Sequence, residues 1–150
     1  MMKKLMIAFL LSPVIYFTVS CTFNAVYVNR PEDNSEGKVF LKRFYSNVKN
    51  EDYKQIDGMI NDSLFQLYGR QGISTMIKFM HTKVGNYKSY VIDDYYIRRI
   101  TGSSNMTYYN YKLKVKYDKG TIDEIIGFRK YNLSEIKINS YHANSDLLIK

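Results

Sequence analysis

Residues 106–118 constrain the fold most, because their apolar and polar side chains alternate one by one. Successive side chains of a β-strand point to opposite faces of a sheet, so this pattern predicts a strand with one buried and one wet face. The buried face would carry Tyr109, Tyr111, Leu113, Val115 and Tyr117, and the wet face Tyr108, Asn110, Lys112, Lys114 and Lys116. An apolar sheet face of this kind needs helices to cover it.

The period of two continues on both sides of this strand. Residues 88–100 are expected to form the strand before it, and residues 121–131 and 134–141 the two strands after it. The short polar connections between them suit tight turns, so the four strands should form an antiparallel meander. Within the third strand, Ile125-Ile126-Gly127 interrupts the alternation, which predicts a bulge or bend there.

Ahead of the strands, apolar residues repeat at helical spacing. Phe40, Phe44 and Val48 are four residues apart, which predicts a first helix that begins near residue 36. Asp52, followed three residues later by Gln55, resembles a capping box and predicts a short second helix. A turn of Asn, Asp and Ser should follow at residues 61–63.

A third helix is expected over residues 72–84, where Gly85 supplies the left-handed conformation that ends many helices. The predicted fold class is therefore α+β, with three helices packed on a curved four-stranded antiparallel meander. This order resembles the cone-shaped nuclear-transport-factor-2-like fold over about residues 36–148, notably in the helix-to-strand passage at residues 83–90 and in a last strand at residues 136–141. A cystatin-like fold, with one helix wrapped by a sheet, is the alternative.

The amino terminus has the form of an export signal that ends in a lipid attachment site. Two lysines precede an apolar run over residues 5–19, which is shorter than the roughly 20 residues that a helix needs to cross a bilayer. Thr18-Val19-Ser20-Cys21 resembles the lipobox of bacterial lipoproteins, in which a diacylglyceryl group is attached to the cysteine thiol. An ordinary secretory cleavage site is the alternative, but Cys21 would then be a free thiol, because it is the only cysteine in the chain.

Three segments follow from these patterns: a lipoprotein signal peptide over residues 1–20, a tether over residues 21–35, and a single domain over residues 36–150. The tether would hold the domain off the membrane. The expected location is the cell envelope, with the lipid on Cys21 in a bacterial membrane, on the periplasmic side of the outer membrane where the organism has one. Loss of the leader lowers the formal net charge of +8 by two, so the mature chain stays basic. Export argues against nucleic acid as its partner.

Candidate pocket residues lie in the first two strands. Asp93 and Asp94 are consecutive, so one of them should face the interior of the cone. Enzymes that this fold resembles, such as ketosteroid isomerases and polyketide cyclases, use a pocket carboxylate or histidine with tyrosine hydroxyls, and Tyr95, Tyr109 and Tyr111 could supply such hydroxyls here. The alternative is that the tyrosines are core residues and that the aspartates pair with Lys or Arg across the hairpin.

The positions of the two histidines in the sequence give little indication of a catalytic role. His81 falls in the last turn of the third helix, where it suits the helix dipole and should be solvated. His142 has Asp146 four residues on, which could orient it as a base, but no motif places a nucleophile beside it. Phosphate-loop, serine-hydrolase and zinc-protease motifs are absent, so the sequence predicts no catalytic residue, no cofactor and no metal site.

Lys112, Lys114 and Lys116 form a basic row on the wet face of the second strand. Such a row is expected to be a solvated face that discourages edge aggregation, or else a contact with anionic lipids or polymers of the envelope. We therefore expect a membrane-anchored envelope lipoprotein that binds a ligand or a protein partner without catalysis. Two alternatives stay open: a small pocket enzyme that uses a buried Asp with Tyr, and an accessory or inhibitor-like protein that contacts another envelope protein.

Overall fold

One antiparallel sheet and a group of helices make up residues 23–69 and 72–149, which the computed structural model describes. The strands are β1 (Ala25–Val28), β2 (Tyr87–Thr101), β3 (Met106–Tyr117), β4 (Gly120–Tyr131) and β5 (Lys137–Asn144). Each strand pairs antiparallel with the next, so the sheet order is β1-β2-β3-β4-β5. The helices are α1 (Pro31–Lys49), α2 (Tyr53–Gly58), α3 (Asp62–Tyr68) and α4 (Gly72–Val84), and a short 3-10 helix, η1 (Asp146–Leu148), follows β5.

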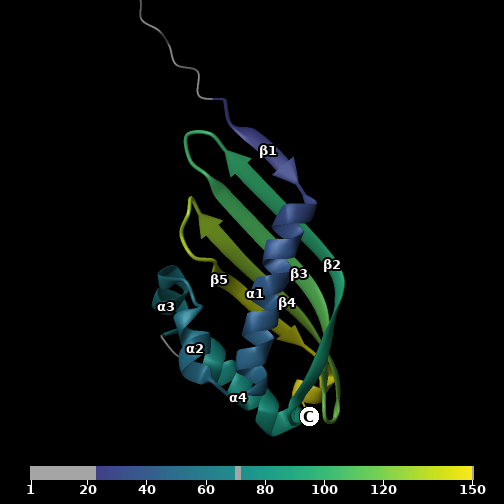
Figure 1. The fold of residues 1–150 in the computed structure, drawn as a ribbon. Helices are drawn as coiled ribbons and strands as arrows, with labels where there is room; N and C mark the ends of the chain where they lie inside the picture. Colours follow the sequence, from purple (N-terminus) through teal and green to yellow (C-terminus); the bar gives the residue numbers. More distant parts are fainter. Residues whose placement is uncertain (1–22, 70–71, 150) are drawn as a thin grey trace, which may run out of the picture.

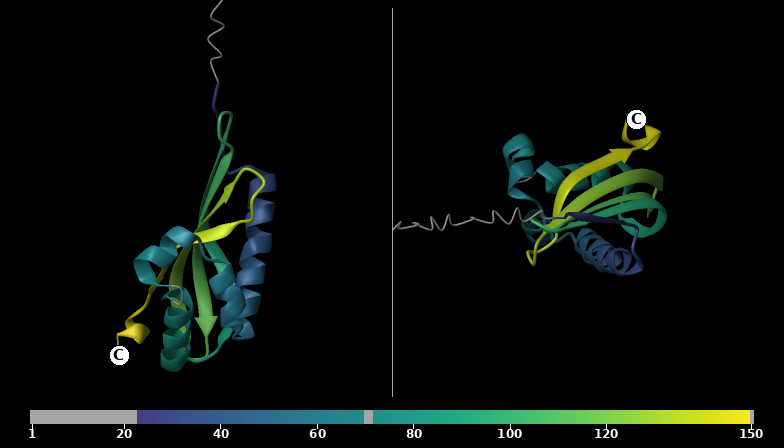
Figure 2. Two further views of the ribbon diagram at one scale, coloured as in Figure 1. Left: turned by 90° about the vertical axis from the view of Figure 1, so that its left-hand side faces the viewer. Right: turned by 90° about the horizontal axis from the view of Figure 1, so that it is seen from above.

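The helix α1 lies across one face of the sheet, and the three shorter helices gather beside it toward the β5 edge (Figure 1). Figure 2 shows the curvature of the sheet from the side and from above. The α+β class is therefore confirmed. Among the described residues, no helix is both long enough and apolar enough to span a membrane. The predicted leader and the predicted lipid attachment site at Cys21 lie outside the described residues.

The burial of β3 confirms the two faces that its alternation predicts. Every second side chain from Thr107 to Tyr117 is buried, and those between them are exposed. The buried face packs against apolar stripes on the helices, which include Phe44 of α1 and Ile77 of α4. Aromatic rings fill the centre of this core, where Phe128 of β4 stacks on Tyr109 with ring centroids 4.8 Å apart. The apolar faces of the helices thus pack on the buried face of the sheet, as the spacing of the apolar residues predicts.

The predicted start of the second helix and the predicted end of the last helix are also confirmed. The side chain of Asp52 accepts a hydrogen bond from the backbone amide of Gln55 at 3.1 Å, as a helix N-cap does. The helix α4 covers the predicted range of residues 72–84. Gly85 has a φ of +83°, and its amide donates to the carbonyl of His81, which closes the helix.

The predicted tether is wrong, because most of it is folded. Residues Ala25–Val28 form β1, which pairs with the end of β2, so the sheet has five strands rather than four. The helix α1 begins at Pro31 rather than near residue 36. Proline suits the first position of a helix, since its missing amide would have no partner there, and the acidic residues Glu32 and Asp33 follow in the first turn. Of the described residues in the predicted tether, Phe23 and Asn24 precede β1, and Asn29 and Arg30 connect β1 to α1.

The predicted turn at residues 61–63 is the start of a further helix, α3, so four α-helices precede β2 in the described residues where three were expected. The side chain of Asn61 accepts a hydrogen bond from the amide of Ser63 at 2.9 Å. Asn, Asp and Ser side chains cap helices as readily as they form turns, which explains the wrong prediction.

The predicted irregularity in β4 is confirmed where that strand meets β5. The register shifts between Gly127 and Phe128, which pair with Ser140 and Ile138, so Asn139 is the extra residue of a bulge. The Ser140 hydroxyl lies so close to Gly127 that a Cβ atom at this position would overlap it. A side chain here would have to displace that hydroxyl, so glycine suits the point where the register shifts.

Candidate functional site

The two aspartates expected at an interior pocket both lie on the outside of the sheet. The pairing of β2 with β3 shifts register between Ile92 and Asp94, so Asp93 is the extra residue of a bulge. A bulge can put two successive side chains on one face, and Asp93 and Asp94 are both exposed. The expectation that one of them faces the interior is wrong. Pairing across the hairpin holds for Asp94, whose carboxylate lies 3.4 Å from the ammonium of Lys112.

A different carboxylate, Glu124 on β4, occupies the interior and is fully buried. It accepts hydrogen bonds from the hydroxyls of Tyr45 on α1 at 2.8 Å, Tyr117 on β3 at 2.7 Å and Tyr141 on β5 at 2.6 Å. The alternation of β4 places it there, because the residues two positions before and after it are buried isoleucines. Glu124 thus joins the helix and three strands from the inside.

Burial and hydrogen bonding act in opposite directions on the pKa of Glu124. Removal from water raises this pKa above its ordinary value, and the three hydroxyl donors offset part of the rise. Burial also raises the pKa of Tyr45, Tyr117 and Tyr141, so their hydroxyls stay protonated as donors. Glu124 is absent from the lining of the hollows of about 220 to 370 Å³ that the described part of the chain forms. A solute has no route to this carboxylate through them.

The three candidate pocket tyrosines take part in the core, as the alternative interpretation expects. Tyr109 and Tyr111 are buried, and Tyr95 is partly buried and stacks on Tyr111 with ring centroids 5.8 Å apart. The hydroxyl of Tyr109 donates to Glu36 at 2.6 Å, and that of Tyr111 donates to the side chain of Asn34 at 3.0 Å. Both hydroxyls therefore hold α1 against the sheet rather than facing an open pocket.

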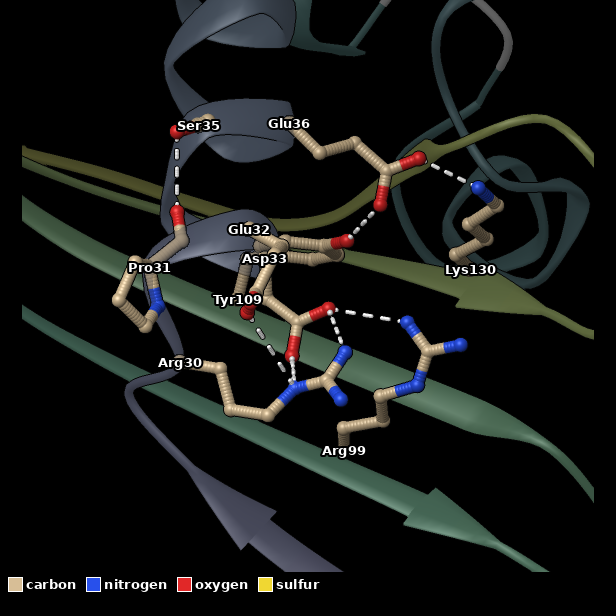
Figure 3. A network of polar contacts seen from close by, with 9 residues as sticks. All are labelled: Arg30, Pro31, Glu32, Asp33, Ser35, Glu36, Arg99, Tyr109 and Lys130. Atoms are coloured by element: carbon tan, nitrogen blue, oxygen red, sulfur yellow. Dashed lines mark hydrogen bonds and ion pairs between the residues drawn. The ribbon is translucent and has the colours of Figure 1, made fainter.

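A network of charged side chains fixes the first turns of α1 to the sheet, as Figure 3 shows. Asp33 is buried and accepts hydrogen bonds from the guanidinium groups of Arg30 and Arg99, each at 2.9 Å. Glu36, one turn later, accepts hydrogen bonds from Tyr109 and Lys130. We call these residues the α1 anchor network. Neither acid was predicted as a site residue, because Asp33 falls in the predicted tether and no motif marks Glu36 at the start of the predicted domain.

Burial acts to raise the pKa of Asp33 and of Glu36, but their partners act more strongly. Hydrogen bonds from Arg30 and Arg99 hold the pKa of Asp33 below its ordinary value. Lys130 and Tyr109 do the same for the pKa of Glu36. Both acids are therefore ionised near neutral pH and are neutralised by their own partners.

A hollow of about 260 Å³ adjoins the α1 anchor network. Glu36 and Lys130 line it together with Val39, Phe40 and Arg43 of α1 and residues 134–136. The charge of Lys130 is already paired with Glu36, and the guanidinium of Arg43 lies 5.4 Å from the centre of the Phe40 ring, as in a cation–π contact. Of these two cations, Lys130 is therefore neutralised by an acid, whereas the ring contact leaves the charge of Arg43 in place.

The predicted basic row lies on the exposed face of the sheet, which we call the outer face. Lys112, Lys114 and Lys116 are all exposed there, as predicted. Lys114 forms an ion pair with Asp123 of β4 at 3.0 Å, in addition to the pair between Lys112 and Asp94. Two of the three lysines therefore have acidic partners, so the row carries less net charge than its sequence indicates.

Exposed apolar side chains lie among these charges on the outer face. They are Val91, Tyr96, Tyr108 and Ile125. The strand register places Val91 beside Lys114, Tyr96 beside Asn110, and Ile125 beside Lys112. The outer face is thus a mixed surface of charged, aromatic and aliphatic side chains rather than a purely basic one.

His81 lies inside the domain near Tyr53, and His142 lies beside Ile125 at the β5 side of the outer face. His81 was expected to be solvated, and this is wrong: its side chain is only 10 % exposed, and its Nδ1 atom lies 3.5 Å from the hydroxyl of Tyr53. Burial lowers the pKa of His81 despite the nearby Glu51, so the ring is neutral at pH 7. His142 is exposed on β5, and within the described ranges no hydrogen bond or ion pair joins it to Asp146.

No three His, Cys, Asp or Glu side chains in residues 23–69 and 72–149 lie close enough together to hold a metal ion. The sealed carboxylate of Glu124, the α1 anchor network and the outer face are therefore the main polar features of the described residues. No protein-family model, no curated protein and no solved structure matches this chain.

Proposed function

We propose that this chain is a lipid-anchored protein of the bacterial cell envelope, which binds a protein partner through the outer face of its sheet and catalyses no reaction. The helices that precede the meander support a nuclear-transport-factor-2-like architecture, with β1 as an additional edge strand. The lipobox-like residues 18–21 support the anchor.

The observation that carries the proposal is the closure of the interior around Glu124. Small-molecule sites are concave and present a few polar groups to the ligand. Here the interior carboxylate is fully buried and accepts hydrogen bonds from three tyrosine hydroxyls. The rings of these tyrosines pack in turn on Phe44 and Tyr87. A filled interior favours a protein that acts through its surface over a pocket enzyme.

The composition of the outer face favours a protein partner over an anionic polymer. Asp94 and Asp123 pair with two of the lysines, which weakens attraction for a polyanion. The exposed rings of Tyr96 and Tyr108 are of the residue type that is enriched at protein interfaces, and the charged pairs around them suit a polar rim. Charges of both signs give specificity for a complementary partner.

Site-specific photo-crosslinking tests this binding function. A photoreactive amino acid replaces Tyr96 in the full-length protein, in cells that naturally produce it, and the matched control carries the same residue in place of Val39 on α1. Val39 is also an exposed apolar residue but lies on the helix. We expect a discrete light-dependent adduct from position 96 and none from position 39. Adducts from neither position, or equally from both, would contradict the proposal.

The anchor is tested separately by fractionation. Cys21→Ser should move the protein from the membrane fraction to the soluble fraction, because the lipid could no longer be attached. Two acyl chains hold a protein stably at a membrane, whereas one chain binds reversibly. Wild-type protein that is wholly soluble after export would show that Cys21 carries no anchor.

A further inference from the structure

Two of the most exposed large apolar side chains that the structure describes lie at one end of the domain. Leu133, in the turn between β4 and β5, is 99 % exposed, and Phe23, just before β1, is 88 % exposed. We call residues 23–24, 102–105 and 131–134 the β1 end. Figure 1 shows β1 and the two turns at the top, and the carboxyl terminus at the bottom. Apolar side chains held in water at one place indicate an apolar partner there.

Hydrogen bonds join the three segments of the β1 end into one platform. The side chain of Asn24 accepts from the amide of Ser103, at 3.2 Å, in the turn between β2 and β3. The amide of Asn132 donates to the carbonyl of Asn105 at 2.7 Å, and the Asn105 amide donates to the Asn132 side chain at 3.2 Å. Leu133 and Phe23 are therefore presented on a connected surface rather than on independent loops.

The proposed anchor lies within a short reach of this platform. Cys21 is four residues before Ala25, the first residue of β1. An extended chain spans at most about 3.6 Å per residue, so the Cα atom of Cys21 lies within about 14 Å of that of Ala25. A lipid on Cys21 would thus bring the β1 end to the membrane surface, since no tether separates the two.

The side chains around the platform suit the interface of a membrane with water. The guanidinium of Arg30 lies over the ring of Tyr27 at 5.1 Å, and that of Arg129 lies over the ring of Tyr131 at 5.1 Å. Arg98 of β2 is exposed beside β1. Tyrosine is enriched at the level of lipid head groups. Arg30 is paired with Asp33, and Arg129 donates to Asn61 and Ser63, which leaves Arg98 to attract anionic head groups. Apolar tips flanked by tyrosine rings and by an exposed arginine suit a lipid surface.

We propose that the β1 end docks directly onto the membrane, with Phe23 and Leu133 inserted at the boundary between lipid head groups and acyl chains. This proposal rests on the lipid anchor of the proposed function. The strands then rise from the bilayer, and the turn between β3 and β4 points away from it. The outer face stands beside the membrane and remains open to a partner.

Depth-dependent quenching of a fluorescent label tests this docking. Acylation blocks the thiol of Cys21, so Leu133→Cys gives the mature protein a single reactive thiol. Ile149→Cys is the matched control, because Ile149 is 83 % exposed and follows η1, whose Leu147 packs at Gly120, the first residue of β4. The full-length acylated proteins are labelled with bimane and reconstituted into vesicles of phosphatidylglycerol and phosphatidylethanolamine with brominated acyl chains. Flotation of the protein together with the vesicles shows whether it is anchored. Quenching of the label by iodide, which stays in the water, measures how exposed the label is.

We expect the label at position 133 to be quenched at least two-fold more by brominated lipid than the label at position 149. Iodide should instead quench the label at position 149 more than the label at position 133. If the proteins float with the vesicles but both labels are equally open to iodide, the docking is wrong and the anchor stands. If the labelled proteins fail to float, the anchor and the docking are both wrong. Because Leu133 makes almost no contact with the rest of the domain, folding of the cysteine variant is not in question.

Discussion

The carboxylate of Glu124 on β4 accepts a hydrogen bond from the hydroxyl of Tyr45 on α1 at 2.8 Å, although 79 residues separate the two in sequence. Both side chains are buried, and two further tyrosine hydroxyls share the same carboxylate. An unpaired polar group in a protein interior costs free energy, whereas a fully hydrogen-bonded one specifies a unique arrangement. The contact therefore fixes how α1 lies on the sheet, and it can be tested by removing its central group.

Replacement of Glu124 by alanine should lower the free energy of unfolding by about 3 kcal/mol or more. The substitution leaves three tyrosine hydroxyls without their acceptor in a dry core and opens a cavity among them. Asp123→Ala, one residue earlier on the exposed side of the same strand, is the matched control and should change stability little. Urea unfolding followed by circular dichroism measures both. Equal losses in the two variants would show that Glu124 is not the centre of the core.

The raised pKa of Glu124 predicts how stability changes with pH. The folded state holds the carboxyl proton more tightly than the unfolded state does. This contribution to stability is therefore largest below the ordinary pKa of about 4.5 and falls as the pH rises through the raised pKa. The difference in unfolding free energy between wild type and Glu124→Gln should become less favourable to wild type over that range. A difference that does not vary with pH would contradict the raised pKa.

Asp33 should show the opposite dependence on pH. The guanidinium groups of Arg30 and Arg99 hold the pKa of Asp33 below 3.8, so the ionised form stabilises the fold. That contribution is present above the ordinary pKa and is lost as the pH falls through the lowered one. Wild type should therefore be more stable than Asp33→Asn at pH 7, and the difference should shrink in acid. Glu32→Gln, which removes only the longer 3.9 Å contact of the Arg30 guanidinium at an exposed position, is the comparison and should lower stability at pH 7 less than Asp33→Asn does.

Gly37→Ala should destabilise the domain, although alanine favours helices by about 1 kcal/mol over glycine. Gly37 lies in α1, and a Cβ atom there would overlap the ring and hydroxyl of Tyr111. The ring would have to leave its place against the helix, with loss of its hydrogen bond to Asn34. In a Tyr111→Leu background, which lacks the hydroxyl, the same substitution should cost less. Gly58→Ala, where a Cβ atom meets open space, is the control.

The regular elements could be predicted because each repeats its apolar side chains over several turns or residue pairs. The long strand β3 and the helix α4 agree with the structure for this reason. The strand β1 could not be found in this way, since its four residues are all exposed and show no period. Its pairing depends on the distant residues 98–101 of β2, and such a contact leaves no local pattern.

The candidate site was predicted less well, because burial of a charged group depends on distant partners. The bulge at Asp93 reverses the alternation of β2, and it arises from the register with β3 rather than from any residue type. The sequence does hold one usable signal for Glu124, since it stands at a core position between two alternating isoleucines. Its three tyrosine donors come from α1, β3 and β5, and no spacing in sequence brings them together.

The short strand β1 also determines how the domain would respond to mechanical load. If the chain is held at Cys21, tension enters at Ala25 and runs along β1, parallel to the strand axis. The hydrogen bonds to β2 are then loaded together in shear instead of opening one after another. Beyond β1 the load passes within a few residues to Asp33, which is bound to Arg99 of β2. The ion pair between Asp33 and Arg99 thus provides a second contact, after the β1–β2 hydrogen bonds, that resists separation of the amino-terminal segment from the sheet.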